Sequence, residues 1–307
     1  MTKGRGLKLG VIGVGSMGQH HARILSTLPG VKLFGVADQD QERVKQIAVR
    51  FGIQPFFDFK ELLPQIDAAV IAVPTSLHFE IAVECLNTGK HLLIEKPLAH
   101  TLDQAQRLVD LAAQKNLILA AGFVERFNPA FQELQKLIRK EKIIGVHVHR
   151  LSPFPERIAD TNVIQDMMIH DLDLVLTLLP KEEIESLKAT GEKVKTKKFD
   201  KVTATIFYRS GLVTKLEADR VFGIKSRKIT VTTERGLIES DLLNKRVYLR
   251  DLQHHVPSVH YTKTKDQLTA ELFDFVSAIK KNSRPKVPGQ EALAAQKLAE
   301  EVEQACS

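Results

Sequence analysis

Cysteine is scarce in this chain of 307 residues, and its two copies, Cys85 and Cys306, lie far apart. Neither belongs to a C-x-x-C motif or has a pair of histidines nearby, which argues against a disulfide framework and a structural zinc site. Long hydrophobic runs are missing too, since no stretch approaches the ~20 apolar residues that a membrane-spanning helix needs. The first apolar run, 7–14, is too short for a signal peptide. We therefore expect a soluble, cytoplasmic protein without a metal site.

Internal repeats and low-complexity tracts are also absent from the sequence. Hydrophobic residues make up 43% and charged residues 26%, which is typical of a globular protein and excludes a disordered or fibrous one. The net charge of +7 favours anionic partners, but Lys and Arg are interspersed with acids. The densest basic run, 193–201, is most simply a solvated loop. We expect no nucleic-acid partner.

Short apolar runs alternate with segments of helical length over residues 1–122. The runs lack polar alternation, as strands buried on both faces do. They are 9–12, 32–37, 68–72, 91–94 and 118–121. Helices are predicted between them, near 16–27, 41–50, 77–87 and 101–114. This order predicts an α/β, doubly wound parallel sheet, a Rossmann domain over 1–122.

The pattern changes after Gly122. Asn128 followed by Pro129 predicts a helix that reaches about residue 140. A strand near 144–150, a helix near 165–179 and a series of six strands follow: 185–191, 201–208, 212–219, 227–233, 236–240 and 245–250. Strands without helices between them predict an open, mainly antiparallel sheet. We expect an α+β domain over 123–307, with closing helices near 265–281 and 289–305 that pack back on the first domain.

A glycine-rich turn, Gly13-Val14-Gly15-Ser16-Met17-Gly18, directly follows the first predicted strand. In such a turn the first glycine permits the tight bend, the second admits a pyrophosphate, and the third allows helix and strand to pack closely. The following helix start offers amide donors to phosphates. The spacing predicts a dinucleotide site. The alternative is a glycine turn that binds no ligand.

Asp38 lies 20 residues after Gly18, at the end of the second predicted strand. A carboxylate there accepts hydrogen bonds from an adenosine ribose and repels a 2′-phosphate. Gln39 adds no compensating charge, whereas Arg43 leaves the question open. We predict NAD as the cofactor, in preference to NADP.

The sequence Glu95-Lys96-Pro97 ends the fourth predicted strand, at the sheet edge where ligands bind in open α/β folds. A lysine there can donate to a substrate hydroxyl or take its proton. The alternative is an exposed ion pair between Lys96 and Glu95. The sequence leaves open whether the peptide bond before Pro97 is cis.

Acidic and imidazole side chains gather in Q-D-M-M-I-H-D-L-D-L, residues 165–174. On a helix, Asp166, His170 and Asp173 follow each other at i+4 and i+3 and share one face. An Asp that orients a neighbouring His is an acid–base arrangement. One alternative is a metal site, although no second histidine stands at ligand spacing. The other is a capped helix with a hydrogen-bonded histidine.

Residues 122–129, G-F-V-E-R-F-N-P, mark the crossing between the predicted domains, and ligands often bind at such crossings. Arg126 can bind a carboxylate, hydroxyl groups or a phosphate there. An interdomain salt bridge is an equal alternative. His20 and His21, early in the first helix, are interpreted as packing or surface residues.

Taken together, these stretches resemble the Gfo/Idh/MocA oxidoreductase family along essentially the whole chain. The likeness rests on G-V-G-S-M-G-Q-H-H-A (13–22), V-A-D (36–38), V-P-T-S-L-H (73–78), G-K-H-L-L-I-E-K-P-L-A (89–99), G-F-V-E-R-F-N-P (122–129) and D-M-M-I-H-D-L-D (166–173). Many members have a glycine pair before the catalytic Asp. This chain has T-N-V-I-Q at 161–165, so its entry loop is expected to differ. The last two stretches look most like the nucleotide-sugar branch, in particular UDP-N-acetylglucosamine 3-dehydrogenases, and inositol dehydrogenases carry similar ones.

The resemblance implies hydride transfer between NAD and a secondary alcohol of a nucleotide-linked sugar, such as C3 of UDP-N-acetylglucosamine. Lys96 and His170 would handle the hydroxyl proton, and Asp166 would orient His170. The cofactor would lie along Pro74, Thr75, His78 and Glu95. Arg126 and Asn128 would position the substrate. Independently of the resemblance, Arg126, Arg157 and the loop lysines are candidates to bind its diphosphate, in keeping with the net charge of +7.

Two alternatives remain open, an inositol or polyol dehydrogenase and a non-catalytic NAD-binding sensor. The presence of Lys96, Asp166 and His170 together argues against the sensor, which has no need of all three. The exposed face of an open sheet needs a partner, so we expect a homodimer or homotetramer.

Overall fold

The computed structural model describes residues 6–154, 161–251, 258–262 and 266–306. Arg157 lies outside these residues. The chain forms two compact units, Met1–Val124 with Leu268–Leu293 and Glu125–Gln267 with Ala294–Ser307. It therefore leaves the first unit after residue 124 and returns to it with the segment 268–293.

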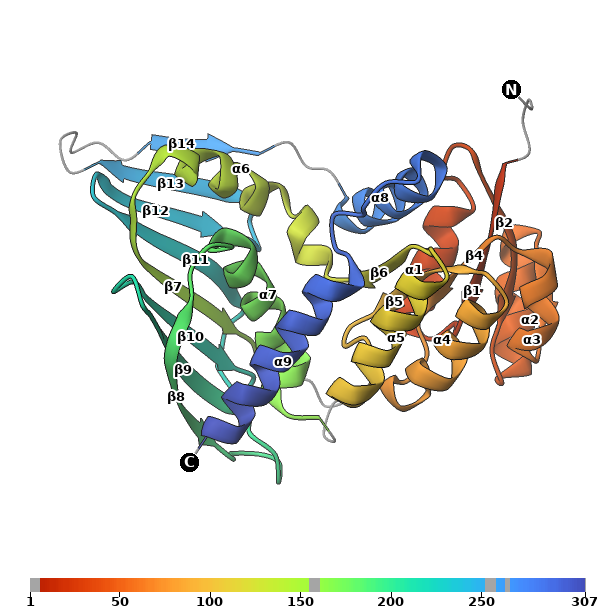
Figure 1. Ribbon diagram of the computed structural model, residues 1–307, viewed down its shortest axis with the longest axis horizontal. Coiled ribbons are helices and arrows are strands. Elements are labelled where there is room, and N and C mark those ends of the chain that lie inside the picture. The colour runs from red at the N-terminus through yellow and green to blue at the C-terminus, as the bar shows by residue number, and fades with distance from the viewer. Residues whose placement is uncertain (1–5, 155–160, 252–257, 263–265, 307) are drawn as a thin grey trace. The chain divides into compact units, whose positions relative to one another are not determined.

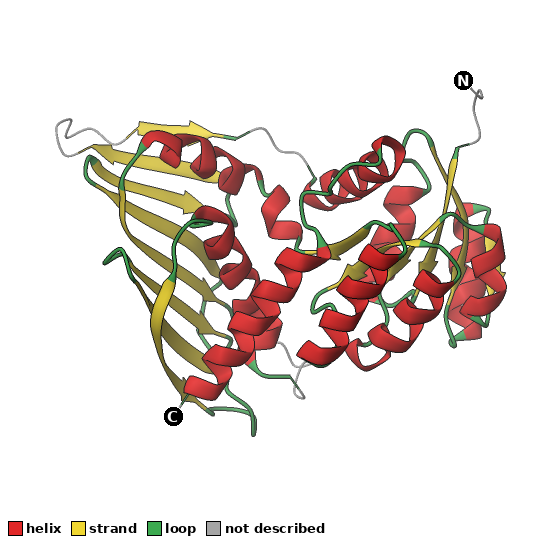
Figure 2. Ribbon diagram, viewed as in Figure 1, coloured by secondary structure: helices red, strands yellow, loops and turns green. Residues whose placement is uncertain are grey.

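The first unit contains a six-stranded parallel sheet in the order β3-β2-β1-β4-β5-β6 (Figures 1 and 2). Its strands are β1 Leu7–Ile12, β2 Val31–Ala37, β3 Gln54–Phe56, β4 Ala68–Ile71, β5 His91–Glu95 and β6 Leu119–Gly122. Its helices are α1 Ser16–Leu25, α2 Gln41–Phe51, α3 Phe59–Leu62, α4 His78–Asn87, α5 Leu102–Gln114 and α8 Gln267–Lys281. This strand order is that of a Rossmann dinucleotide-binding domain, so the predicted fold class is confirmed.

Local sequence explains where these elements begin and what they bury. Asp40 caps α2 by accepting from the backbone N–H of Arg43, and Thr101 caps α5 in the same way. All four residues of β4 are buried, as expected for a strand covered on both faces. The apolar face of α8 adds Leu272 and Phe275 to the same core as β1 and α1.

The second unit contains an eight-stranded sheet in the order β14-β13-β12-β11-β7-β10-β9-β8 (Figure 1). Its strands are β7 Ile143–Leu151, β8 Ile184–Glu192, β9 Lys201–Tyr208, β10 Val213–Asp219, β11 Ser226–Thr233, β12 Gly236–Asp241, β13 Arg246–Asp251 and β14 Ser258–Tyr261. Its helices are α6 Pro129–Leu137 and α7 Ile169–Leu178, while α9 Gly289–Ala305 is divided between the units. Only β7 and β10 pair in parallel among the described strands of this sheet. The sheet is thus mainly antiparallel, as predicted.

One face of this sheet is buried and the other is half-exposed. Buried and accessible residues alternate along β9 and β10, the period of a strand with one covered face. The helices α6 and α7 lie over the buried face (Figure 1), with α6 against β12 and α7 against β7. Asn128 caps α6 and Pro129 is its first residue, as predicted.

The helix predicted over 165–179 begins differently in the structure. Residues Ile164–Met168 form a π-helix, and α7 starts only at Ile169. A π-helix has i→i+5 hydrogen bonds, so the i+4 spacing that was expected to align Asp166 with His170 does not apply across this boundary. The prediction of one uninterrupted α-helix is wrong here.

Within the described ranges, no helix combines the length and the apolar character needed to cross a bilayer. Both cysteines are free thiols. Burial raises the pKa of the Cys85 thiol to about 12. This cysteine is therefore protonated and unreactive at neutral pH.

Candidate active site

The glycine-rich turn joins β1 to α1, and each glycine has different surroundings. Gly13 has φ +89°, and a Cβ there would lie 2.6 Å from the Ala72 carbonyl oxygen. A Cβ at Gly18 would lie 1.8 Å from the Gly13 carbonyl oxygen, so only glycine permits this packing. A Cβ at Gly15 would have no described neighbour within 4 Å. The turn is closed toward the sheet and open at Gly15, where a pyrophosphate approaches in this fold.

The start of α1 is suited to bind an anion. Gly15 is the N-cap, and among the described side chains none caps the helix. The first turn contains no acidic residue, and Ser16 and Met17 are exposed beside it. Helix N-terminal N–H groups and the helix dipole stabilise bound phosphate. Together with the open space at Gly15, these residues fit the diphosphate of a dinucleotide.

Asp38 follows β2 and is held against the glycine turn. Its carboxylate accepts hydrogen bonds from the backbone N–H of Val14 at 2.8 Å and of Asp40 at 3.0 Å. A carboxylate has about four acceptor sites, so two remain for other donors. Arg43 forms an ion pair with Asp40 at 2.8 Å. The ribose contact of Asp38 remains a prediction.

His78 links two loops at the carboxyl end of the sheet. Its ring nitrogens lie 2.9 Å from the carbonyl oxygens of Val73 and Pro97. Burial lowers the pKa of His78, although both carbonyls act to raise it. The neutral ring can donate to only one of them. The side chain thus ties the turn of Pro74 and Thr75 to the turn that carries Lys96, and its contact with the cofactor remains a prediction.

Glu95 ends β5 and contacts a buried histidine. Its Oε1 lies 2.8 Å from Nε2 of His21, whose side chain is 0% exposed, whereas that of Glu95 is 15% exposed. Lys96 comes next and is half-buried, and its peptide bond to Pro97 is cis. The structure therefore places the E-K-P turn at the carboxyl edge of the parallel sheet, where ligands bind in this fold.

Asp166 and His170 belong to the second unit, and both are half-buried. Asp166 lies in the π-helix and His170 in the first turn of α7. The start of this segment is fixed by Asn162, whose Oδ1 accepts from the backbone N–H of Gln165 at 2.9 Å. The T-N-V-I-Q stretch thus supplies a side-chain cap at the start of this helical segment.

Asp171, next to His170, is buried in a network of charged side chains. The guanidinium of Arg150 donates to Asp171 at 2.7 to 3.0 Å and to Glu125 at 3.1 Å. Arg227 also donates to Glu125, at 2.9 Å. Burial acts to raise the pKa of Glu125, but Arg150 and Arg227 lower it below its usual range. The network joins two strands, β7 and β11, to the helix that carries His170.

Arg126 and Asn128 are buried within the second unit, at 3% and 1% exposure. Arg126 forms a salt bridge with Asp173, with Nε 2.7 Å from the carboxylate and a second, short contact from Nη2. The carboxylate of Asp173 therefore binds the guanidinium of Arg126.

Asn128 uses its side chain in the same unit. Its Oδ1 accepts from the Ala130 N–H, and its Nδ2 donates to Glu125 and to the Leu242 carbonyl. The salt bridge considered for Arg126 exists, but within one unit. These contacts give both side chains a structural use, and their contact with substrate stays a prediction.

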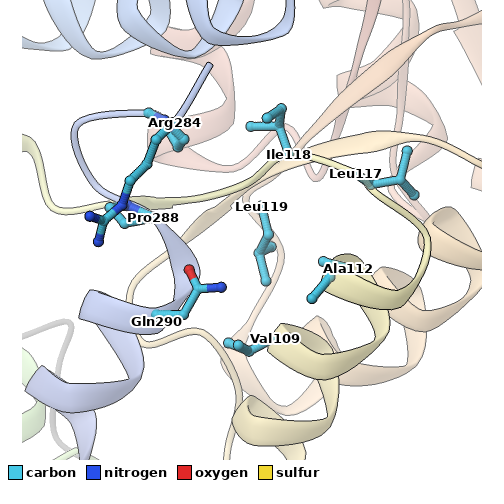
Figure 3. Close-up of a pocket in the computed structure, with 10 residues that line it drawn as sticks. Val109, Ala112, Leu117, Ile118, Leu119, Arg284, Pro288 and Gln290 are labelled. Atoms are coloured by element: carbon cyan, nitrogen blue, oxygen red, sulfur yellow. The ribbon is translucent and has the colours of Figure 1, made fainter. Parts of the chain in front are cut away.

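A hollow of about 430 Å³ lies elsewhere in the first unit (Figure 3). Figure 3 shows Leu119 near the centre of the view, with Val109 of α5 and Gln290 of α9 below it and Arg284 at the upper left. Leu117 and Ile118, which precede β6, also line it. The hollow therefore lies at the amino end of β6, whereas the E-K-P turn follows the carboxyl end of the neighbouring strand β5. We assign it no part in cofactor binding.

Sequence reasoning missed the residue that organises the buried network. Arg150 follows Val146 and Val148 on the buried face of β7. A charged residue in an apolar alternation was the available signal, because a buried charge needs a buried partner. The partner itself, Asp171, lies 21 residues away in the sequence.

Two family models match the chain. The oxidoreductase family's NAD-binding Rossmann fold matches residues 7–123, and its C-terminal alpha/beta domain matches residues 159–307. The chain belongs to the Gfo/Idh/MocA family of oxidoreductases. It is thus an NAD(P)-binding dehydrogenase of the kind that acts on CH–OH groups of sugars and their derivatives. The resemblance seen in the sequence is confirmed.

Several relatives are similar over most of their length. The chain is 33% identical over 289 residues to UDP-N-acetylglucosamine 3-dehydrogenase of Acidithiobacillus ferrooxidans, covering 89% of this chain and 88% of that protein. A solved structure of that dehydrogenase from the same organism has a TM-score of 0.93 and 32% identity, with 98% of this chain and 97% of the other covered. Myo-inositol 2-dehydrogenase of Thermotoga maritima is 27% identical over 308 residues, covering 93% of this chain and 92% of that protein.

Proposed function

We propose that this protein oxidises the C3 alcohol of a nucleotide-linked N-acetylglucosamine, such as UDP-N-acetylglucosamine, with NAD⁺. The observation that carries the proposal is the 33% identity, over 89% of the chain, to a UDP-N-acetylglucosamine 3-dehydrogenase. The net charge of +7 suits a substrate with a diphosphate. A neutral polyol has no use for such a field.

The proposed chemistry is carried by three half-buried side chains, Lys96, Asp166 and His170. When bound, NAD⁺ supplies the acceptor for the hydride from the carbinol carbon. Lys96 donates a hydrogen bond from Nζ to the substrate oxygen, and the imidazole of His170 takes the hydroxyl proton. Asp166 orients that imidazole and stabilises its charged form.

The proposed cofactor is NAD in preference to NADP. The carboxylate of Asp38, held at the glycine turn, would repel a 2′-phosphate. Arg43, which could neutralise that phosphate, is paired with Asp40. The preference therefore follows from the charge of these side chains.

A panel of substrates tests the proposal. We expect NAD⁺ reduction to show the highest kcat/KM with UDP-N-acetylglucosamine when compared with UDP-glucose, free N-acetylglucosamine and myo-inositol. The free sugar should lose kcat as well as affinity, because binding energy from the remote diphosphate helps to position the reacting carbon. Turnover of myo-inositol without a response to any UDP-sugar would contradict the proposal.

The second candidate is an inositol dehydrogenase, and it has its own support. The Thermotoga maritima myo-inositol 2-dehydrogenase is 27% identical over 93% of this chain. The same panel separates the two candidates. A protein that binds NADH but oxidises no member of the panel would instead be a sensor.

We further propose a cytoplasmic homodimer or homotetramer, assembled through the half-exposed face of the eight-stranded sheet. That face carries accessible residues in alternate positions of β9 and β10. Sedimentation equilibrium of the purified protein gives the oligomeric state directly. A monomer at every concentration would contradict this assembly.

A further inference from the structure

The side chain of Glu271 carries a carboxyl group beside apolar residues of the core. It lies on α8 beside Leu272, and both Leu272 and Phe275 belong to the core of the first unit. Glu271 is 2% exposed, and neither of its carboxylate oxygens has a hydrogen-bond partner among the described residues. Burying an unpaired carboxylate ion is very unfavourable, so such a group stays neutral.

The charged neighbours of Glu271 are acidic, and they have donors of their own. Glu95 ends β5, and its Oε1 contacts Nε2 of His21 on α1 at 2.8 Å. Asp274, one turn along α8, accepts from the backbone N–H of Lys286 at 2.7 Å. Burial, reinforced by Glu95 and then by Asp274, raises the pKa of Glu271 well above its usual range. Burial and the acidic neighbours therefore both favour the neutral form of Glu271.

Glu95 lies directly before Lys96, and its carboxylate is close to both His21 and Gly122. His21 contacts its Oε1, and a Cβ on Gly122 of β6 would lie 2.9 Å from its Oε2. Glycine at position 122 thus leaves room for the carboxylate. The loop after Lys96 is tied by His78, on which Glu95 also acts electrostatically. A change in the charge beside Glu95 therefore acts on the turn that carries Lys96.

We propose that Glu271 is a positioning residue of the dehydrogenase site, whose neutral form preserves the contact between Glu95 and His21. Loss of the proton from Glu271 adds a negative charge that acts on Glu95, the residue directly before Lys96, and two carboxylates repel each other. Nicotinamide cofactor then binds less tightly. The proposal rests on the proposed function only for the role of Lys96, since the binding of NADH can be measured without any sugar.

The test compares the native protein with Glu271→Gln, a neutral side chain of nearly the same shape. The dissociation constant of NADH is measured by its fluorescence from about pH 6 to about pH 9. Between about pH 6 and about pH 9, the dissociation constant of NADH should rise in both proteins or in the native protein alone. We expect this rise to be roughly threefold to tenfold larger in the native protein than in Glu271→Gln, because only the native protein gains a second carboxylate charge. The titration of groups that both proteins share cancels in this ratio. Glu80→Gln, which changes an exposed carboxyl on α4, should follow the native profile.

One further variant and one spectrum complete the design. Glu271→Leu removes the polar group and should weaken NADH binding at every pH, whereas Glu271→Gln should bind like the native protein at neutral pH. Parallel pH profiles for the native and Gln proteins, or a Gln variant as weak as Leu, would overturn the proposal. If the variants fail to fold, infrared difference spectra of the native protein still decide, because a protonated carboxyl band must be present at neutral pH and must vanish over the range in which NADH affinity falls. None of these outcomes depends on the identity of the sugar.

Discussion

The side chains proposed to react with the substrate are more exposed to solvent than the side chains that fix the position of the surrounding helix. Lys96, Asp166 and His170 are half-buried. Asp171 and Asp173, which follow His170 in the sequence, are buried and paired with arginines. Acid–base groups must reach the substrate, whereas a positioning ion pair is most rigid without water. The contrast supports separate tasks for neighbouring acids.

Single replacements at the three half-buried positions test this division. We expect Lys96→Met and His170→Ala each to lower kcat by roughly 10²–10⁴-fold, the range for loss of a positioned acid or base. Asp166→Asn should cost less, because its task is to orient and to stabilise charge. NADH should still bind to His170→Ala, since His170 belongs to the second unit. Near-normal turnover in all three variants would show that the site lies elsewhere.

Replacement of Asp38 tests the cofactor preference. Asp38→Ala removes a negative charge from the ribose position and a hydrogen bond to the Val14 N–H. We expect weaker binding of NAD and a smaller ratio of kcat/KM between NAD and NADP. Steady-state kinetics with both cofactors measure this ratio. A native enzyme with the higher kcat/KM for NADP would refute the assignment.

The sequence identified these residues through motifs but could not identify their partners. Arg126 stands in a motif that suggested a substrate contact, and nothing in the sequence indicated that its guanidinium also pairs with Asp173, 47 residues away. Glu271 falls at an apolar position of α8, a detectable signal, yet only the fold brings it near Glu95. The pairing of buried charges depends on tertiary packing, and the periodicity of apolar residues in the sequence does not specify that packing.

At the scale of elements, α7 is fastened by buried ion pairs. Arg150 on β7 and Arg126 in the turn Val124–Phe127 each bind an aspartate of that helix. The position of His170 thus depends on contacts made by its neighbours along α7. Removal of one partner leaves a buried charge without compensation.

We therefore predict that Arg150→Met lowers the free energy of unfolding by about 3–5 kcal/mol, the usual cost of breaking a buried ion pair. Lys142→Met is the matched control, because its pair with Glu234 joins side chains that are 76% and 57% exposed. The loss of this exposed pair should change the free energy of unfolding much less than the loss of the buried pair. Urea denaturation of both variants gives the comparison. Equal costs would mean that the network around Asp171 does not hold α7.

Most helices and strands were predictable because each has a pattern of apolar residues that is typical of one kind of element. The strands of the first unit are short apolar runs, and those of the second alternate. Two strands were not predicted, β3 and β14, with only three and four residues. The π-helix before α7 also escaped prediction, because hydrogen-bond spacing is not encoded in an apolar pattern that suits both helix types.

At the scale of the whole molecule, the chain visits the first unit twice. The helix α8 returns to complete a core begun by β1 and α1. The sequence predicted a closing helix near 265–281, but its place in that core is a tertiary property. The overall Rossmann order and the second sheet followed from the succession of elements.

The net charge of +7 also acts at this scale. If exposed cations attract the diphosphate, added salt should raise KM for UDP-N-acetylglucosamine, because such charges are screened over ~8–10 Å at physiological ionic strength. kcat should change little. A KM independent of salt would show that the basic residues are ordinary surface charge. Initial rates across a sodium chloride series measure the effect.

The most direct measurement follows the hydrogen itself. UDP-N-acetylglucosamine with deuterium at C3 is incubated with the enzyme and NAD⁺, and the nicotinamide product is examined by mass spectrometry and proton NMR. We expect the deuterium to appear at C4 of the nicotinamide ring, together with a 3-keto sugar nucleotide. Formation of NADH without deuterium would place the oxidation at another carbon, and no reduced nicotinamide at all would contradict the proposed dehydrogenase of this substrate.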